Sequence, residues 1–135
     1  MRRFIPLVVA VAAAAALATQ ALSSMMSPET VEKSAKFGKV LANEKHLALY
    51  TWNKEKDHKV HCTGACAKLW PPLLVAKGEA VPKHVPGAMG TFGVVMRPDG
   101  SHQVTWNHRP LYTFSKDTPT KILCNGVQGW YVAKA

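Results

Sequence analysis

Three cysteines and one histidine are the residues best suited to chemistry in this chain of 135 residues. Three residues, including Gly64, separate Cys62 from Cys66. His61 directly precedes Cys62, and Cys124 stands alone. In an exported protein such a Cys-x3-Cys segment is most simply a local disulfide. It is not a haem-attachment motif, because no His follows Cys66. A zinc site is also disfavoured, because no second Cys/His pair stands at ligand spacing.

Copper or thiol-redox chemistry is the alternative use of this segment, since thiolate and imidazole are soft ligands that suit copper. The ligands would be His61, Cys62 and Cys66, and the further candidates are His58, Met89 and Met96. Histidines and methionines scattered over a basic surface are more often ordinary, so no metal or cofactor is the primary expectation. No Ser/His/Asp order and no paired-carboxylate pattern indicates a hydrolase, so no catalytic residue is assigned.

Two tyrosines are each followed by an aromatic residue two positions later and an acid five positions later. The two sets are Tyr50, Trp52 and Glu55, and Tyr112, Phe114 and Asp117. In a strand, residues two apart share one face, so each aromatic pair is expected to help form a core. The acid then lies just past the strand end, where it can cap the turn or accept a hydrogen bond. The competing interpretation is an aromatic platform with a carboxylate, as in a ligand groove.

An internal duplication positions these residues. Leu49 to Lys54 recurs at Leu111 to Lys116, an offset of 62 residues (111 − 49), and the same offset carries Cys62 onto Cys124. Trp70 and Trp130 then close the two copies. This predicts two structural units, about 37–76 and 91–133, that share one core.

The residue pattern from position 37 onward predicts an all-β antiparallel body. Short runs of β-branched and aromatic residues are separated by turn residues, as in hairpins, and no sustained helical period appears. The expected strands lie in Phe37 to Leu41, Leu47 to Trp52, Phe92 to Arg97, His102 to Trp106 and Leu111 to Ser115.

The N-terminus predicts export. Arg2 and Arg3 precede an apolar run of about 14 residues, which is short of the roughly 20 that span a bilayer, so residues 1–21 are expected to be a helical signal peptide. Residues 22–36 lack a period and are expected to be a tether, and 37–135 a single domain. A leader that stays uncleaved is the only membrane attachment expected. No Cys lies near the cleavage region to carry a lipid, and the protein is expected to be periplasmic or secreted.

Charge indicates the kind of partner. The 17 basic residues fall to 15 once Arg2 and Arg3 leave, against 8 acidic residues, for a net charge of +7 (15 − 8). The lysines are spread out rather than clustered, so nucleic acid is not an expected partner. A surface of this kind attracts anionic lipid, cell-wall polymer or an acidic protein.

The motifs resemble a bacterial secreted-repeat family, whose members are predicted lipoproteins with a Tyr-x4-Asp motif and largely unknown function. The resemblance rests on Tyr112 to Asp117, on Cys62 to Ala67 followed by Trp70-Pro71-Pro72-Leu73, and on Arg97 to Gly100 with Pro110-Leu111-Tyr112. It implies an envelope location and a two-repeat β fold, and it supplies no catalytic residues. Glu55 in place of Asp, the missing lipid-anchor Cys, and Cys124 depart from the family pattern.

Two disulfide pairings are open on physical grounds. Closing the 63 residues from Cys62 to Cys124 would stabilise by about 4 kcal/mol, against about 2 kcal/mol for the 5-residue loop to Cys66. The family resemblance carries Cys62 and Cys66 together as one motif, and a turn at Gly64 permits that short bridge. Cys62–Cys66 is therefore the expected pair, with Cys124 free or in an intermolecular bond.

The leading hypothesis is an exported envelope protein without enzymatic activity, a β module that binds or packs against an anionic envelope component or an envelope protein. The rival is a periplasmic copper-handling or thiol-redox accessory protein.

Overall fold

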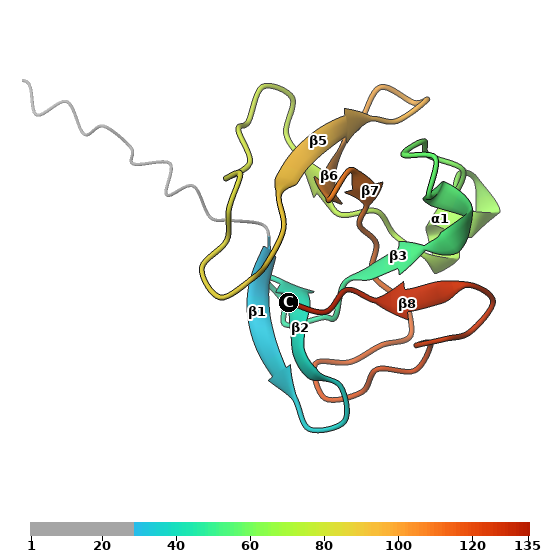
Figure 1. The fold of residues 1–135 in the computed structure, drawn as a ribbon. Coiled ribbons are helices and arrows are strands. Elements are labelled where there is room, and N and C mark those ends of the chain that lie inside the picture. The colour runs from blue at the N-terminus through green and yellow to red at the C-terminus, as the bar shows by residue number, and fades with distance from the viewer. Residues whose placement is uncertain (1–28) are drawn as a thin grey trace, which may run out of the picture.

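The structure, a computed structural model, describes residues 29–135 (Figure 1). The predicted signal peptide and the first part of the predicted tether lie outside these residues. The elements, in chain order, are β1 (Glu29–Ser34), β2 (Gly38–Asn43), β3 (Tyr50–Trp52), the 3-10 helix η1 (Asn53–Glu55), α1 (Ala65–Leu69), β4 (Leu74–Val75), β5 (Phe92–Met96), β6 (His102–Trp106), β7 (Arg109–Pro110) and β8 (Trp130–Val132).

The strands form three small antiparallel sheets. β1 pairs with β2, β3 pairs with β8, and β6 lies in a third sheet between β4 and β5, with β7 also paired to it. Single bridges such as Ala42↔Ala48 and Val40↔Lys134 link the first sheet to its neighbours. The predicted all-β antiparallel fold is confirmed, and the predicted strands at 92–97 and 102–106 are β5 and β6.

Turn chemistry explains the two hairpins around β6. Between β5 and β6, the Arg97 amide donates to the Ser101 carbonyl over 2.8 Å, and Gly100 takes a φ of 84°. Between β6 and β7 only Asn107 and His108 form the loop, with φ values of 49° and 64°. Positive φ at both residues is what a tight two-residue hairpin requires.

Strands of the two copies pair with each other. The Tyr50 amide donates to the Tyr112 carbonyl over 2.8 Å, and the Tyr112 amide donates to the Tyr50 carbonyl over 3.0 Å. β3 of the first copy pairs with β8 of the second, while residues 71–73 of the first copy bond to 111–113 of the second. Each copy therefore completes its strand pairing only with the other.

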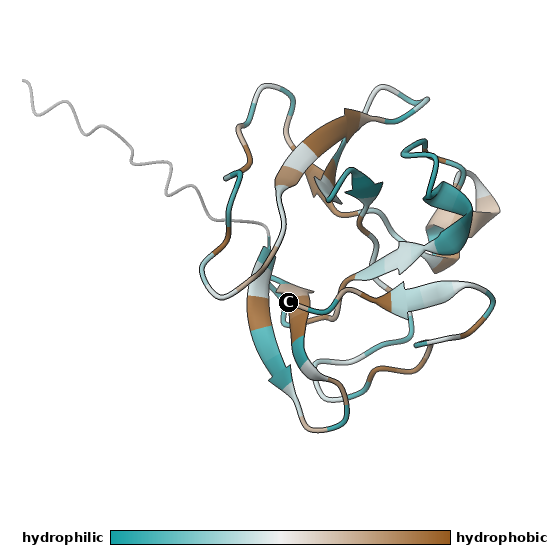
Figure 2. Ribbon diagram, in the orientation of Figure 1, coloured by the Kyte–Doolittle hydropathy of each residue, from teal (hydrophilic) through white to brown (hydrophobic). Residues whose placement is uncertain are grey.

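Side-chain alternation divides the core in two. The aromatic cluster contains the fully buried Tyr50 and Tyr112, and the aliphatic cluster contains Leu49 and Leu111, which point the opposite way. Figure 2 shows brown, hydrophobic segments on β2 and β5, whereas β1 is mostly teal with one brown band. The expected burial of both tyrosines and of Phe114 is confirmed, whereas Trp52 is only half-buried.

The tether prediction is wrong for residues 29–36. Glu29–Ser34 form β1, which pairs with all six residues of β2, and Val31 packs on the aliphatic cluster. The segment shows no apolar alternation, since Val31 is its only hydrophobic residue. Pairing with β2 satisfies its backbone groups, and this outweighs a polar sequence.

Helix α1 is an element that the expected all-β body did not include. It begins after Gly64, whose φ is 58°, and ends at Leu69, with Trp70 as its C-cap ahead of Pro71 and Pro72. Its five residues are too few to show a helical period in the sequence. No helix within residues 29–135 is long and apolar enough to cross a membrane.

Because strands of the two copies pair with each other, we expect that neither copy folds alone. Residues 29–78 and 79–135, produced separately, should each give the circular dichroism and poorly dispersed amide NMR spectrum of an unfolded chain, because each lacks its partner strand. Mixing them should restore the native spectrum. The matched control is the whole chain cut between the exposed Gly78 and Glu79, which should stay folded. A native-like spectrum from either fragment alone would contradict this dependence on pairing between the copies.

Candidate functional site

The two tyrosine motifs are joined crosswise. The Tyr50 hydroxyl donates to Asp117 Oδ2 over 2.6 Å, and the Tyr112 hydroxyl donates to Glu55 Oε2 over 2.8 Å. Each tyrosine thus bonds the acid of the other copy. The sequence motif places an acid five residues after each Tyr and gives no sign of this exchange.

Each carboxylate also holds the loop that follows it. Glu55 Oε2 accepts the His61 amide over 2.6 Å and the Cys62 amide over 3.2 Å. Asp117 Oδ1 accepts the Leu123 amide over 2.9 Å. Both acids reach an amide six residues later, so the prediction that they hold the turns beyond the strands is confirmed.

The protonation of these groups follows from burial. Burial, with the neighbouring carboxylate, raises the pKa of both Tyr50 and Tyr112 well above the usual range, so both hydroxyls stay donors. Burial also raises the pKa of Asp117. Neither tyrosine has any exposed surface, so neither ring is open to a ligand.

The aromatic side chains form a stacked column. Trp130 lies between Trp52 and Trp70, with ring centroids 4.9 Å and 3.9 Å away, and the rings are nearly parallel. Tyr50 meets Trp70 edge-on, and Tyr112 meets Trp130 edge-on, each at 5.1 Å. These rings pack against one another, which favours the core interpretation of the motif over the ligand platform.

Arg97 is a buried residue whose contacts sequence reasoning did not foresee. Its guanidinium donates to Gln103 Oε1 and to the Cys62 carbonyl, both over 2.7 Å. Gln103 Nε2 in turn donates to the Leu111 carbonyl over 2.7 Å. The Arg97-Pro98-Asp99-Gly100 turn was the available signal, since it fixes the position of Arg97 at the end of β5.

The cysteines pair as expected. Cys62 and Cys66 form a disulfide with Cα atoms 5.2 Å apart, and Cys124 is free and half-buried. The His61 ring bonds Asp57 Oδ2 over 2.6 Å. With their sulfurs joined to each other, Cys62 and Cys66 do not form a ligand set with His61. Within residues 29–135 no three His, Cys, Asp or Glu side chains are grouped to hold a metal.

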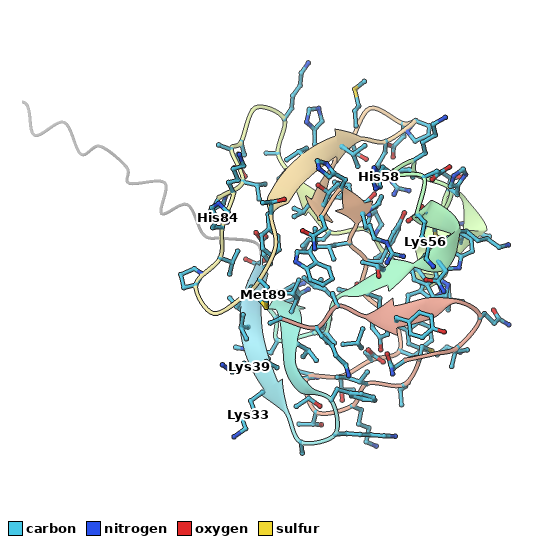
Figure 3. All side chains as sticks on the ribbon, in the orientation of Figure 1. Lys33, Lys39, Lys56, His58, His84 and Met89 are labelled. Atoms are coloured by element: carbon cyan, nitrogen blue, oxygen red, sulfur yellow. A yellow bond between two sulfur atoms is a disulfide. The ribbon has the colours of Figure 1, made fainter. Side chains whose placement is uncertain are left out.

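A hollow of about 480 Å³ lies between the β1–β2 hairpin and the loop 118–123. Sequence reasoning missed it, because it assigned one wall to the tether. Lys33, which lies on this wall, is labelled in Figure 3. The lining residues are Glu32, Lys33, Ser34, Ala35, Lys36, Phe37, Val40, Ala42, His46, Ala48, Thr118, Pro119, Thr120, Lys121, Ile122 and Leu123.

The fold and the crossed motifs define a two-repeat β protein. A family model described as a secreted repeat of unknown function matches residues 32–74 and 93–134. The chain belongs to this family, which bears out the resemblance drawn from its motifs. No curated protein and no solved structure gave a match.

The crossed bonds predict a specific pattern of energetic coupling. Tyr50→Phe and Asp117→Ala should each lower the free energy of unfolding by about 0.5–2 kcal/mol, as expected for a lost buried hydrogen bond or cap. In a double-mutant cycle from urea unfolding, this pair should couple by about 1 kcal/mol. Tyr50 paired with Glu55, the acid of its own copy, is the control and should show a coupling near zero. The opposite ranking would contradict the crossed assignment.

Proposed function

We propose that this secreted protein is a binding module of the cell envelope, without enzymatic activity, and that its ligand is an anionic single-chain amphiphile such as a fatty-acid carboxylate. The observation that carries the proposal is the hollow between the β1–β2 hairpin and loop 118–123, which combines an apolar lining with a lysine rim. A periplasmic position would give it access to such molecules.

The size and lining of the hollow suit an acyl chain. Its volume of about 480 Å³ falls within the range of roughly 300–1,000 Å³ typical of small-molecule sites. Its apolar side chains come from both walls: Phe37, Val40, Ala42, Ala48, Ile122 and Leu123. Transfer of an acyl chain from water to such a surface is favourable in proportion to the apolar area covered.

The charges at the hollow favour an anionic head group. Lys33, Lys36 and Lys121 are exposed and line it. Glu32 is the acid that lines the hollow, and its bond to the His46 ring partly offsets its negative charge. Lys36 Nζ lies 5.4 Å from the centroid of the Phe37 ring, which places a cation beside the apolar lining. A concentration of one sign of charge raises the local concentration of the opposite ion.

The repeat architecture supports the site. One wall comes from β1 and β2, and the other is the loop whose end is fixed when Asp117 accepts the Leu123 amide. The carboxylate that bonds Tyr50 therefore also positions the second wall. A fixed, preformed site loses less conformational freedom on binding.

Binding of hexadecanoate to the purified protein, measured by calorimetry, tests the proposal. Lys36→Ala with Lys121→Ala should weaken binding about tenfold, because two exposed ion pairs contribute roughly 0.2–1 kcal/mol each. Ile122→Asn should also weaken it, because the change places an amide against the acyl chain. Lys68→Ala, a single change on α1 outside the hollow, is the control and should leave the affinity unchanged.

Three outcomes would contradict the proposal. The first is no binding by the folded protein, and the second is equal binding by the double variant and the Lys68 control. The third is binding to phosphatidylglycerol vesicles without binding of the single-chain carboxylate, which would indicate a general surface attraction rather than use of the hollow. Hexadecanol, the neutral analogue, should bind more weakly than the carboxylate.

A further inference from the structure

Two histidines from different copies meet at the surface. His58 follows η1, and His108 is the second residue of the β6–β7 turn. Their ring centroids lie 5.4 Å apart with the planes tilted by 35°. Both side chains are exposed, and His58 is labelled in Figure 3. In the sequence His58 lies three positions from His61, whereas the structure places its ring beside that of His108.

Both histidines occupy backbone positions that favour glycine. The φ angle is 66° at His58 and 64° at His108, in the left-handed region that most side chains adopt at a cost. Two-residue hairpin loops of the Asn107–His108 kind strongly prefer Asn-Gly. A non-glycine residue held in this region is an observation that motivates a search for a functional side chain.

The rings have no competing protein partners. Among the described residues, neither His58 nor His108 makes a side-chain hydrogen bond or ion pair, whereas the His46 ring bonds Glu32 and the His61 ring bonds Asp57. Their ring nitrogens are therefore open to an exogenous ligand. A neutral imidazole is the commonest protein ligand for transition metals.

The spacing of the rings fits one shared ion. With metal–nitrogen bonds of about 2.0–2.1 Å, two imidazole centroids on one ion lie about 4.5 Å apart at the right angle typical of Cu²⁺ and about 5 Å apart at the tetrahedral angle. The observed 5.4 Å is slightly longer, so a small rotation of the exposed rings brings both onto one ion. The charged residues nearest in sequence are the cationic Lys56, Lys59 and Arg109 and the anionic Asp57. Their net positive charge does not attract a cation, so binding rests on coordination by the two imidazoles.

We propose that His58 and His108 form a two-imidazole binding site for a divalent transition metal. Cu²⁺ would bind most tightly, with water molecules in its remaining coordination positions. Imidazole suits copper, nickel and zinc, and Cu²⁺ has the highest affinity of the divalent first-row series for a given nitrogen site. The site differs from the His61, Cys62 and Cys66 set, and it does not depend on the amphiphile site in the hollow.

A bound ion would join the two copies. His58 lies in the first family match, 32–74, and His108 in the second, 93–134. An ion that binds the folded chain and not the unfolded one raises stability through mass action. Acid should release it, because protons compete with the metal for the imidazole nitrogens.

Titration of the chelator-treated full chain with CuSO4, in a Cys124→Ser background that removes the free thiol, tests the site. We expect a site of micromolar dissociation constant, nitrogen hyperfine structure in the electron paramagnetic resonance spectrum, and a higher unfolding midpoint with Cu²⁺. His58→Asn and His108→Asn should each weaken this binding at least tenfold. His84→Asn and His102→Asn are matched controls and should leave it unchanged.

His108→Gly separates the metal site from a structural role. It should lose the copper site while the metal-free protein becomes more stable, because glycine adopts the positive φ without strain. If copper binding survives His58→Asn combined with His108→Asn, or is lost in the two control variants, the site lies elsewhere and the inference is overturned. Absence of any micromolar site in the folded protein would also overturn it.

Discussion

The crossed hydrogen bonds from Tyr50 to Asp117 and from Tyr112 to Glu55 set the arrangement of the rest of the molecule. A buried carboxylate is costly unless donors surround it, and a buried tyrosine hydroxyl needs an acceptor. Here each tyrosine hydroxyl finds its acceptor in the other copy, so neither copy alone satisfies the hydroxyl of its own tyrosine. The same carboxylates accept amides from the following loops. Core packing, repeat assembly and loop position therefore rest on two pairs of side chains.

The two copies use this common framework differently at their ends. In the first, the loop after Glu55 is closed by the Cys62–Cys66 disulfide and held again when Arg97 donates to the Cys62 carbonyl. In the second, Cys124 occupies the position of Cys62 with no partner cysteine, and the loop before it forms a wall of the hollow. Duplication supplies two equivalent loops, and the disulfide closes only the first of them.

The sequence predicted those features that depend on local pattern. Alternation of Leu49 with Tyr50, and of Leu111 with Tyr112, gave the buried faces, and the turn residues gave the β5–β6 hairpin. Pairing across the copies was not predictable, because the sequence shows that Tyr50 and Asp117 recur but not which Tyr meets which acid. β1 was missed because its pairing with β2, rather than its own hydrophobic pattern, makes it a strand. The hollow was missed with it, since β1 provides one wall.

Both proposed sites are built from one segment of each copy, and this has a thermodynamic consequence. The hollow needs the β1–β2 hairpin and loop 118–123, and the copper site needs His58 and His108. A ligand at either place binds only when the copies are assembled, so its binding free energy adds to the stability of the assembled state. The crossed tyrosine–carboxylate bonds hold the copies in register before any ligand arrives. Binding at either proposed site would therefore be coupled to assembly of the two repeats rather than to the folding of one repeat.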